Sequence, residues 1–211
     1  MLQRIRLQRF KGIEDASFDV GGINVLVGAN NSGKSSVIQG LHFGVGIIQT
    51  INIHSERLRN GAVSLNPLQI IYSPSESIYS LGIGGRLRAE EHDAIRLSLT
   101  LQNGELGGII IRRGRNRNIN VTLENPDIIL PLGDLEHPFS IFSPGLAGIA
   151  KNESYISDGV LLRAIARGDA NLFLRNILLR LWENPEWDSF LQDIHEVFPG
   201  LEIKVSFAEE T

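Results

Sequence analysis

The chain has 211 residues, of which 21% are charged and 42% hydrophobic, with a formal net charge of −4 and no cysteine. These values are ordinary for one globular domain with a small subdomain, and they exclude disulfides and thiolate metal sites. The negative charge excludes a general attraction to nucleic acid or membranes but not a local basic patch. No apolar run reaches the roughly 18 residues of a membrane span and the start lacks a signal peptide, so we expect a cytoplasmic protein without a membrane partner.

Three strands are predicted at the start of the chain. Residues 4–8 and 16–20 alternate polar and apolar side chains, as half-buried strands do, and Lys11 with Gly12 lies in the turn between them. Residues 23–27 are mostly apolar without alternation. Such a run is typical of a strand that is covered on both faces.

The sequence "GANNSGKSS" follows this third strand and matches G-x-x-x-x-G-K-[ST] at every defined position. In this pattern the glycines let backbone N–H groups surround a polyphosphate, and the N-terminus of the next helix adds positive charge. Lys34 would reach the β- and γ-phosphates, and the Ser35 hydroxyl would bind Mg²⁺. The predicted nucleotide-binding residues are Gly28, Asn30, Asn31, Ser32, Gly33, Lys34, Ser35 and Ser36.

A helix is predicted directly after the motif. Val37, Ile38, Leu41 and Val45 are spaced along one helical face. Gly44 and Gly46 are expected to loosen the end of this helix. Strand, glycine-rich loop and helix is the order in which a phosphate cradle is built, so the context favours a phosphate site over a chance turn.

The next part of the chain predicts an antiparallel meander. Residues 50–90 have no sustained period, whereas 95–101, 109–111 and 119–123 are apolar or alternating and are separated by turns. The second turn, "RRGRNR" at 112–117, could contact a phosphate backbone. A solvated hairpin tip is the favoured interpretation, because no aromatic residue interleaves with these arginines.

The last third of the chain changes character. Prolines and glycines are frequent over residues 126–150, around one short predicted strand at 139–142. Helical periodicity follows, with apolar positions near 161–165, 173–181 and 190–198, and alternation over 201–207 predicts a final strand. We therefore expect a strand-rich nucleotide-binding lobe at 1–135 and a helical lobe at 136–211.

The opening of the chain, to about residue 45, resembles the start of ABC-type ATPase heads of the SMC/RecF/OLD group. The resemblance rests on the Phe10-Lys11 pair, on Asn24 and on the glycine-rich motif. It implies an α/β P-loop NTPase fold, ATP with Mg²⁺ as ligands, and Lys11 as a further nucleotide-binding residue. It also implies an ATP-dependent homodimer of heads, DNA as a partner, and a role in DNA repair, DNA processing or defence against foreign DNA.

Four parts of such a head have no convincing match. These are a glutamine at the entrance to the helical lobe, an LSGGQ-like signature, a Walker B strand ending in Asp-Glu, and a switch histidine. The glycine-rich run 81–86 precedes the helical lobe, Asp134 follows a strand broken by proline, and Glu209-Glu210 end a one-faced strand. No catalytic residue is assigned. We expect the N-terminal part of a longer ATPase, with the helical lobe ending before the signature and Walker B; the alternative is a non-catalytic, nucleotide-gated interaction module.

Overall fold

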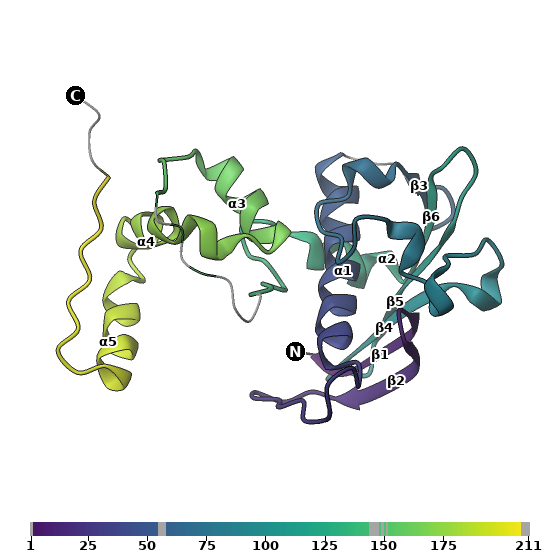
Figure 1. Ribbon diagram of the computed structural model, residues 1–211, viewed down its shortest axis with the longest axis horizontal. Coiled ribbons are helices and arrows are strands. Elements are labelled where there is room, and N and C mark those ends of the chain that lie inside the picture. The colour runs from purple at the N-terminus through teal and green to yellow at the C-terminus, as the bar shows by residue number, and fades with distance from the viewer. Residues whose placement is uncertain (1, 55–57, 144–147, 149, 151, 208–211) are drawn as a thin grey trace. The chain divides into compact units, whose positions relative to one another are not determined.

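The computed structural model describes residues 2–54, 58–143, 148, 150 and 152–207 (Figure 1). The chain forms two compact units, Met1–Phe142 (unit 1) and Ser143–Thr211 (unit 2). Glu209 and Glu210, considered above as the end of a Walker B strand, lie outside the described residues. The division into a nucleotide-binding lobe at 1–135 and a helical lobe at 136–211 stays a prediction.

Unit 1 is built on a six-stranded antiparallel sheet in the order β2-β1-β4-β5-β6-β3. The strands are β1 (Leu2–Phe10), β2 (Ile13–Asp19), β3 (Ala62–Leu65), β4 (Ile95–Leu101), β5 (Leu106–Arg113) and β6 (Ile119–Glu124). Five of these strands confirm the sequence prediction, including the turns at Lys11-Gly12 and Asn103-Gly104. The prediction missed β3, because four residues are too few to display an alternating pattern.

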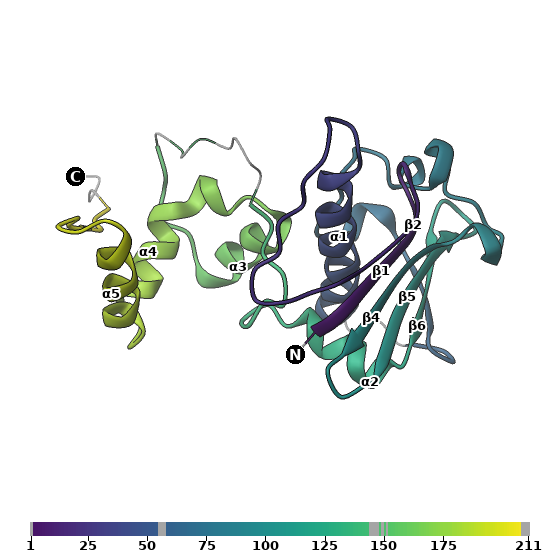
Figure 2. The same cartoon turned by 90° about the horizontal axis from the view of Figure 1, so that it is seen from below.

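The core of unit 1 lies between the sheet and α1 (Lys34–Ile53), which runs along one face of the sheet (Figures 1 and 2). The helix continues past Gly44 and Gly46 to Ile53, so the expectation that these glycines loosen its end was wrong. A Cβ at Gly44 would lie 2.4 Å from Leu97 Cδ2, and one at Gly46 would lie 3.1 Å from Tyr72 Cβ. The absence of side chains at these positions lets the helix approach the sheet and the Tyr72 segment closely.

Three predicted strands are not formed. Residues 23–27, 139–142 and 201–207 have no strand structure. In the first of these runs, Ile23 is 92% exposed and Val27 is 88% exposed. Extended apolar residues become a strand only when a neighbouring strand supplies hydrogen bonds, and among the described residues none pairs with these runs.

Unit 2 contains α3 (Asp158–Arg167), α4 (Leu174–Trp182) and α5 (Trp187–Val197), which lie where helical periodicity was predicted near 161–165, 173–181 and 190–198. Glu153 caps the start of α4, where its carboxylate accepts the backbone N–H groups of Arg175 and Asn176 at 2.9 and 2.8 Å. The remaining α-helix, α2 (Pro126–Ile129), belongs to unit 1. None of the helices in the described part of the chain has the length and apolar character needed to cross a membrane.

Candidate phosphate-binding site

The glycine-rich motif borders a hollow of about 540 Å³ at the N-terminus of α1. Eight of the nine predicted nucleotide-binding residues line it, and Gly12 completes the lining. Only Gly28 lies outside the lining, and its carbonyl oxygen holds the Lys34 side chain. The structure therefore gathers Lys11 and the motif, which are distant in sequence, around one space. The predicted residues that line it are Lys11, Asn30, Asn31, Ser32, Gly33, Lys34, Ser35 and Ser36.

Backbone geometry explains the residue types of the motif. Gly33, which precedes the helix, has φ 93°, a value that residues with a Cβ rarely adopt. Asn31 has φ 65° in the turn that is closed by the Ser32 N–H and the Ala29 carbonyl at 3.3 Å. A Cβ at Gly28 would lie 2.9 Å from Ser32 Oγ. The backbone conformation of this turn therefore requires glycine at position 33, whereas a Cβ at position 28 would only require the Ser32 hydroxyl to move.

The helix presents free N–H groups to this hollow. The first intrahelical hydrogen bond joins Val37 N–H to the Gly33 carbonyl at 3.0 Å. Within the described part of the chain, the N–H groups of Lys34, Ser35 and Ser36 have no acceptor, and the first turn contains no acidic residue. Unpaired N–H groups and the positive end of a helix dipole together form an anion-binding surface.

Lys34 is folded against its own loop. Its Nζ donates to the carbonyl oxygens of Gly28 at 2.8 Å and Ala29 at 2.7 Å. These contacts hold the ammonium group at the rim of the hollow, where it adds positive charge. A phosphate entering the hollow would offer stronger, charge-assisted hydrogen bonds than two neutral carbonyls.

Lys11 reaches the hollow from the β1–β2 turn. Its Nζ donates to Gln39 Oε1 at 2.8 Å and to the Pro74 carbonyl at 3.3 Å, and its backbone has φ 53°. Partial burial lowers the pKa of this ammonium group from its ordinary value. Sequence reasoning did not identify Gln39, although its position on the predicted helix, four residues after Ser35, would place both on one face.

The lining contains two lysines and no carboxylate. It therefore suits an anion, and it contains no Asp, Glu or His side chain to act as a general base towards water. Ser35 offers Mg²⁺ one oxygen ligand, so the ion would take its other ligands from phosphate oxygens and water. In the described residues no group of three or more His, Asp or Glu side chains is placed to hold a metal ion by itself.

An apolar groove adjoins the phosphate-binding hollow. It has a volume of about 720 Å³ and lies between residues 23–26, the end of β2 and the first turns of α1. Val25 on the loop side is 77% exposed and Ile38 on the helix side is 49% exposed. Lys34 and Ser35 line both spaces, so the groove and the hollow share one wall.

No protein-family model and no curated protein matches this chain. It is similar, at 15% identity and TM-score 0.30, to a solved structure from work on the structural biochemistry of ATP-driven dimerization and DNA stimulated activation of SMC ATPases; the match covers 62% of this chain and 75% of the other. A TM-score this low carries no argument about function, which must be inferred from the site itself.

Proposed function

We propose that the protein binds Mg-ATP in the hollow at the start of α1. The observation that carries the proposal is the free N–H groups of Lys34, Ser35 and Ser36 facing a space bordered by two lysines and no carboxylate. The triphosphate would lie across these N–H groups, with Lys34 on the β- and γ-phosphates and Ser35 on Mg²⁺. Lys11 would add a second cation from the β1–β2 turn.

Nucleotide binding would rearrange both lysines. Lys34 would exchange the carbonyls of Gly28 and Ala29 for phosphate oxygens. Lys11 would exchange Gln39 and Pro74 in the same way, which would release the segment around Pro74. An anion beside the Lys11 ammonium would offset the partial burial that lowers its pKa.

We further propose that the chain is the N-terminal part of an SMC/RecF/OLD-like ATPase that acts in DNA repair, DNA processing or defence against phage. The residues that carry the resemblance, Phe10-Lys11, Asn24 and the motif, support this proposal. So does the exposed apolar run at 23–27, which is suited to burial by further strands. Two such heads closing on two nucleotides would form the ATP-dependent homodimer.

The alternative is a module that binds nucleotide without hydrolysing it and thereby controls contact with a protein or DNA partner. The lining of the hollow fits this alternative, because it contains no Asp, Glu or His side chain to act as a general base. ATP turnover by the 211-residue chain would contradict the alternative if Lys34→Ala abolished it. Nucleotide binding without turnover fits both proposals.

A binding titration with a fluorescent ATP analogue and Mg²⁺ tests the common claim. We expect Lys34→Ala to weaken binding at least about tenfold, because a charge-assisted phosphate contact is lost. Lys204→Ala is the matched control, since Lys204 lies in unit 2 with an 88% exposed side chain, and it should bind as the unmodified protein does. Equal, saturable, Mg²⁺-dependent binding by the Lys34→Ala variant would refute the site.

A further inference from the structure

A second hollow in unit 1 is lined by arginines. It has a volume of about 610 Å³ and lies between the segment 77–90 and the β5–β6 hairpin. Arg86 and Arg88 line it from the first side and Arg113 from the second. Figure 1 shows the β5–β6 hairpin and the loop that precedes α1 at opposite ends of unit 1, so this hollow is separate from the phosphate-binding one.

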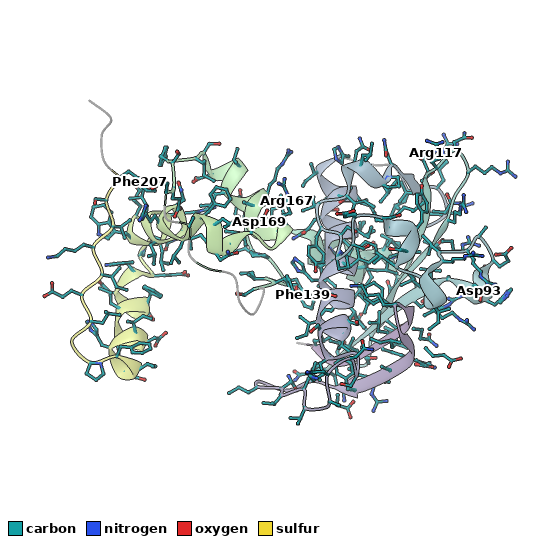
Figure 3. The ribbon with its side chains drawn as sticks, in the orientation of Figure 1. Asp93, Arg117, Phe139, Arg167, Asp169 and Phe207 are labelled. Carbon is teal, nitrogen blue, oxygen red and sulfur yellow. The ribbon has the colours of Figure 1, made fainter. Side chains whose placement is uncertain are left out.

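Positive charge at this end of the sheet exceeds the acidic partners available. Two carboxylates are already shared: Asp93 pairs with Arg9 and Arg88 at 3.2 and 3.3 Å, and Glu91 pairs with Arg96 and Arg112 at 3.5 and 3.7 Å. Figure 3 shows Arg117 at the end of the hairpin and Asp93 on a separate segment at the same side of unit 1. Four arginines have no carboxylate within ion-pair distance in the described part of the chain, namely Arg86, Arg113, Arg115 and Arg117. One acidic residue, Glu90, lies in the lining.

Hydrogen bonds fix the backbone of the two segments that carry the arginines. The Tyr79 hydroxyl donates to the Arg117 carbonyl, and the Arg113 guanidinium lies 5.6 Å from the centre of the Tyr79 ring. The Arg113 N–H donates to the Arg88 carbonyl at 2.9 Å, which ties the hairpin to the neighbouring segment. Asn116 and Arg117 both have positive φ, which makes the turn tight. Because these contacts fix the backbone of both segments, binding costs less backbone entropy here than at a mobile hairpin tip.

This arrangement changes the interpretation of the arginine-rich turn. Sequence reasoning favoured a solvated tip, because no aromatic residue lies among the arginines in the chain. The fold brings Tyr79 to the hairpin from a segment 38 residues away, where its hydroxyl binds Arg117. Arg86 and Arg88 arrive with the same segment. The cationic surface is therefore made by two segments and is larger than the run at 112–117 alone.

We propose that this surface, made of Arg86, Arg88, Arg113, Arg115 and Arg117 around the 610 Å³ hollow, binds the phosphodiester backbone of a nucleic acid. Guanidinium groups match phosphate oxygens in bidentate geometry. Unpaired arginines on both segments suit a ligand with several phosphates better than a single small anion. A lipid surface fits less well, because none of the exposed large hydrophobic residues belongs to this part of unit 1.

Recognition of this kind would depend on salt and not on base sequence, because it involves phosphates only. The proposal for this surface does not depend on ATP binding in the other hollow. Segment 77–90 does, however, contact the β1–β2 turn that lines the other hollow. The Leu81 carbonyl accepts the Lys11 N–H at 2.7 Å, and Gly82 forms a bridge with Phe10. Loss of nucleotide binding in Lys34→Ala should leave nucleic-acid binding unchanged, so the two proposals can fail separately.

Fluorescence anisotropy with a labelled DNA duplex of about 20 base pairs tests the proposal. The informative variant is Arg86→Ala/Arg115→Ala, because neither side chain makes a hydrogen bond or ion pair in the described structure and the fold should persist. We expect about tenfold weaker binding and a salt dependence reduced by about two phosphate contacts. Arg59→Ala/Arg163→Ala removes the same charge from exposed positions outside this surface and should stay within about twofold of the unmodified protein.

Each other outcome overturns the proposal. Equal weakening by the two double variants would show a general charge effect and no site. Saturable binding of inorganic phosphate or of an acidic peptide, without DNA or RNA binding, would assign the surface to another ligand. Absence of saturable binding to duplex DNA and to single strands at low salt would refute it outright. Circular dichroism of each variant verifies that the fold is retained.

Discussion

Two apolar runs in unit 1 have similar sequences and different surroundings. Ile109, Ile110 and Ile111 in β5 are 1%, 6% and 1% exposed, whereas Ile23 and Val25 are 92% and 77% exposed. Both runs are rich in β-branched residues, and both predict a strand that is covered on two faces. Only the first run has become one.

The difference lies in hydrogen-bonding partners rather than in side chains. β5 pairs with β4 on one edge and with β6 on the other, so its backbone is satisfied along its length. The run at 23–27 has no such neighbour among the described residues, and Asn24 binds back to Gly21 through two hydrogen bonds of 2.9 and 3.1 Å. Strand propensity describes how well a residue fits a sheet, and it does not supply the sheet.

Among substitutions in the two runs, Ile111→Ala should change the free energy of unfolding most. Ile111 belongs to the main core and faces Ile95 and Val121 on the neighbouring strands. The substitution removes buried apolar atoms and leaves a cavity, and together these effects should lower the free energy of unfolding by about 2–5 kcal/mol. Urea denaturation followed by circular dichroism measures this change.

Tryptophan fluorescence provides an internal control for that measurement. Trp182 and Trp187 both belong to unit 2, so their signal reports on the helical unit and not on the sheet. A change below about 1 kcal/mol in the unfolding of unit 1 would mean that β5 is not the packed centre of this fold.

Much of unit 1 could be predicted from the sequence because the meander is local. Strands 95–101, 109–111 and 119–123 are consecutive and antiparallel, so each finds its partner across a short turn. The missed strand β3 pairs with β6 from more than fifty residues away in the chain. The prediction of a strand at residues 23–27 was wrong for the reverse reason. Its apolar pattern was clear, but no strand among the described residues pairs with it.

The candidate phosphate site could be predicted from the sequence because its chemistry depends on the backbone conformation of nine consecutive residues. A glycine at φ 93° and a lysine directly after it leave a recognisable pattern. The contact between Gln39 and Lys11 could not be predicted, because it depends on how the β1–β2 turn packs against α1. Only part of the arginine surface could be predicted from the sequence, because Tyr79, Arg86 and Arg88 are brought to the hairpin by the tertiary structure.

A smaller effect is expected from Gly44→Ala, which tests the buried half of α1. Alanine is intrinsically better than glycine in a helix by about 1 kcal/mol. Its Cβ would lie 2.4 Å from Leu97 Cδ2 and 3.3 Å from Ile109 Cδ1, and both of these side chains are buried. Overpacking should outweigh the propensity gain and leave a net loss of about 1–2 kcal/mol in the free energy of unfolding.

Gly159→Ala is the matched control for this substitution. Gly159 lies in the first turn of α3, and a Cβ there would meet no atom within 4 Å. Only helix propensity then changes, so the free energy of unfolding of unit 2 should rise by up to about 1 kcal/mol. Denaturation followed by tryptophan fluorescence measures this change. If Gly44→Ala also stabilised the protein, α1 would not pack against the sheet as closely as described.

The smallest effect should come from Ile23→Ala, which repeats the Ile111 substitution in the exposed run. Because the Ile23 side chain is 92% exposed, its truncation should change the free energy of unfolding by less than about 0.5 kcal/mol. A loss similar to that of Ile111→Ala would show that a strand covers residues 23–27 in solution. If that loss grew with protein concentration, the covering strand would come from a second copy of the chain, because mass action makes the stability of a dimer depend on concentration.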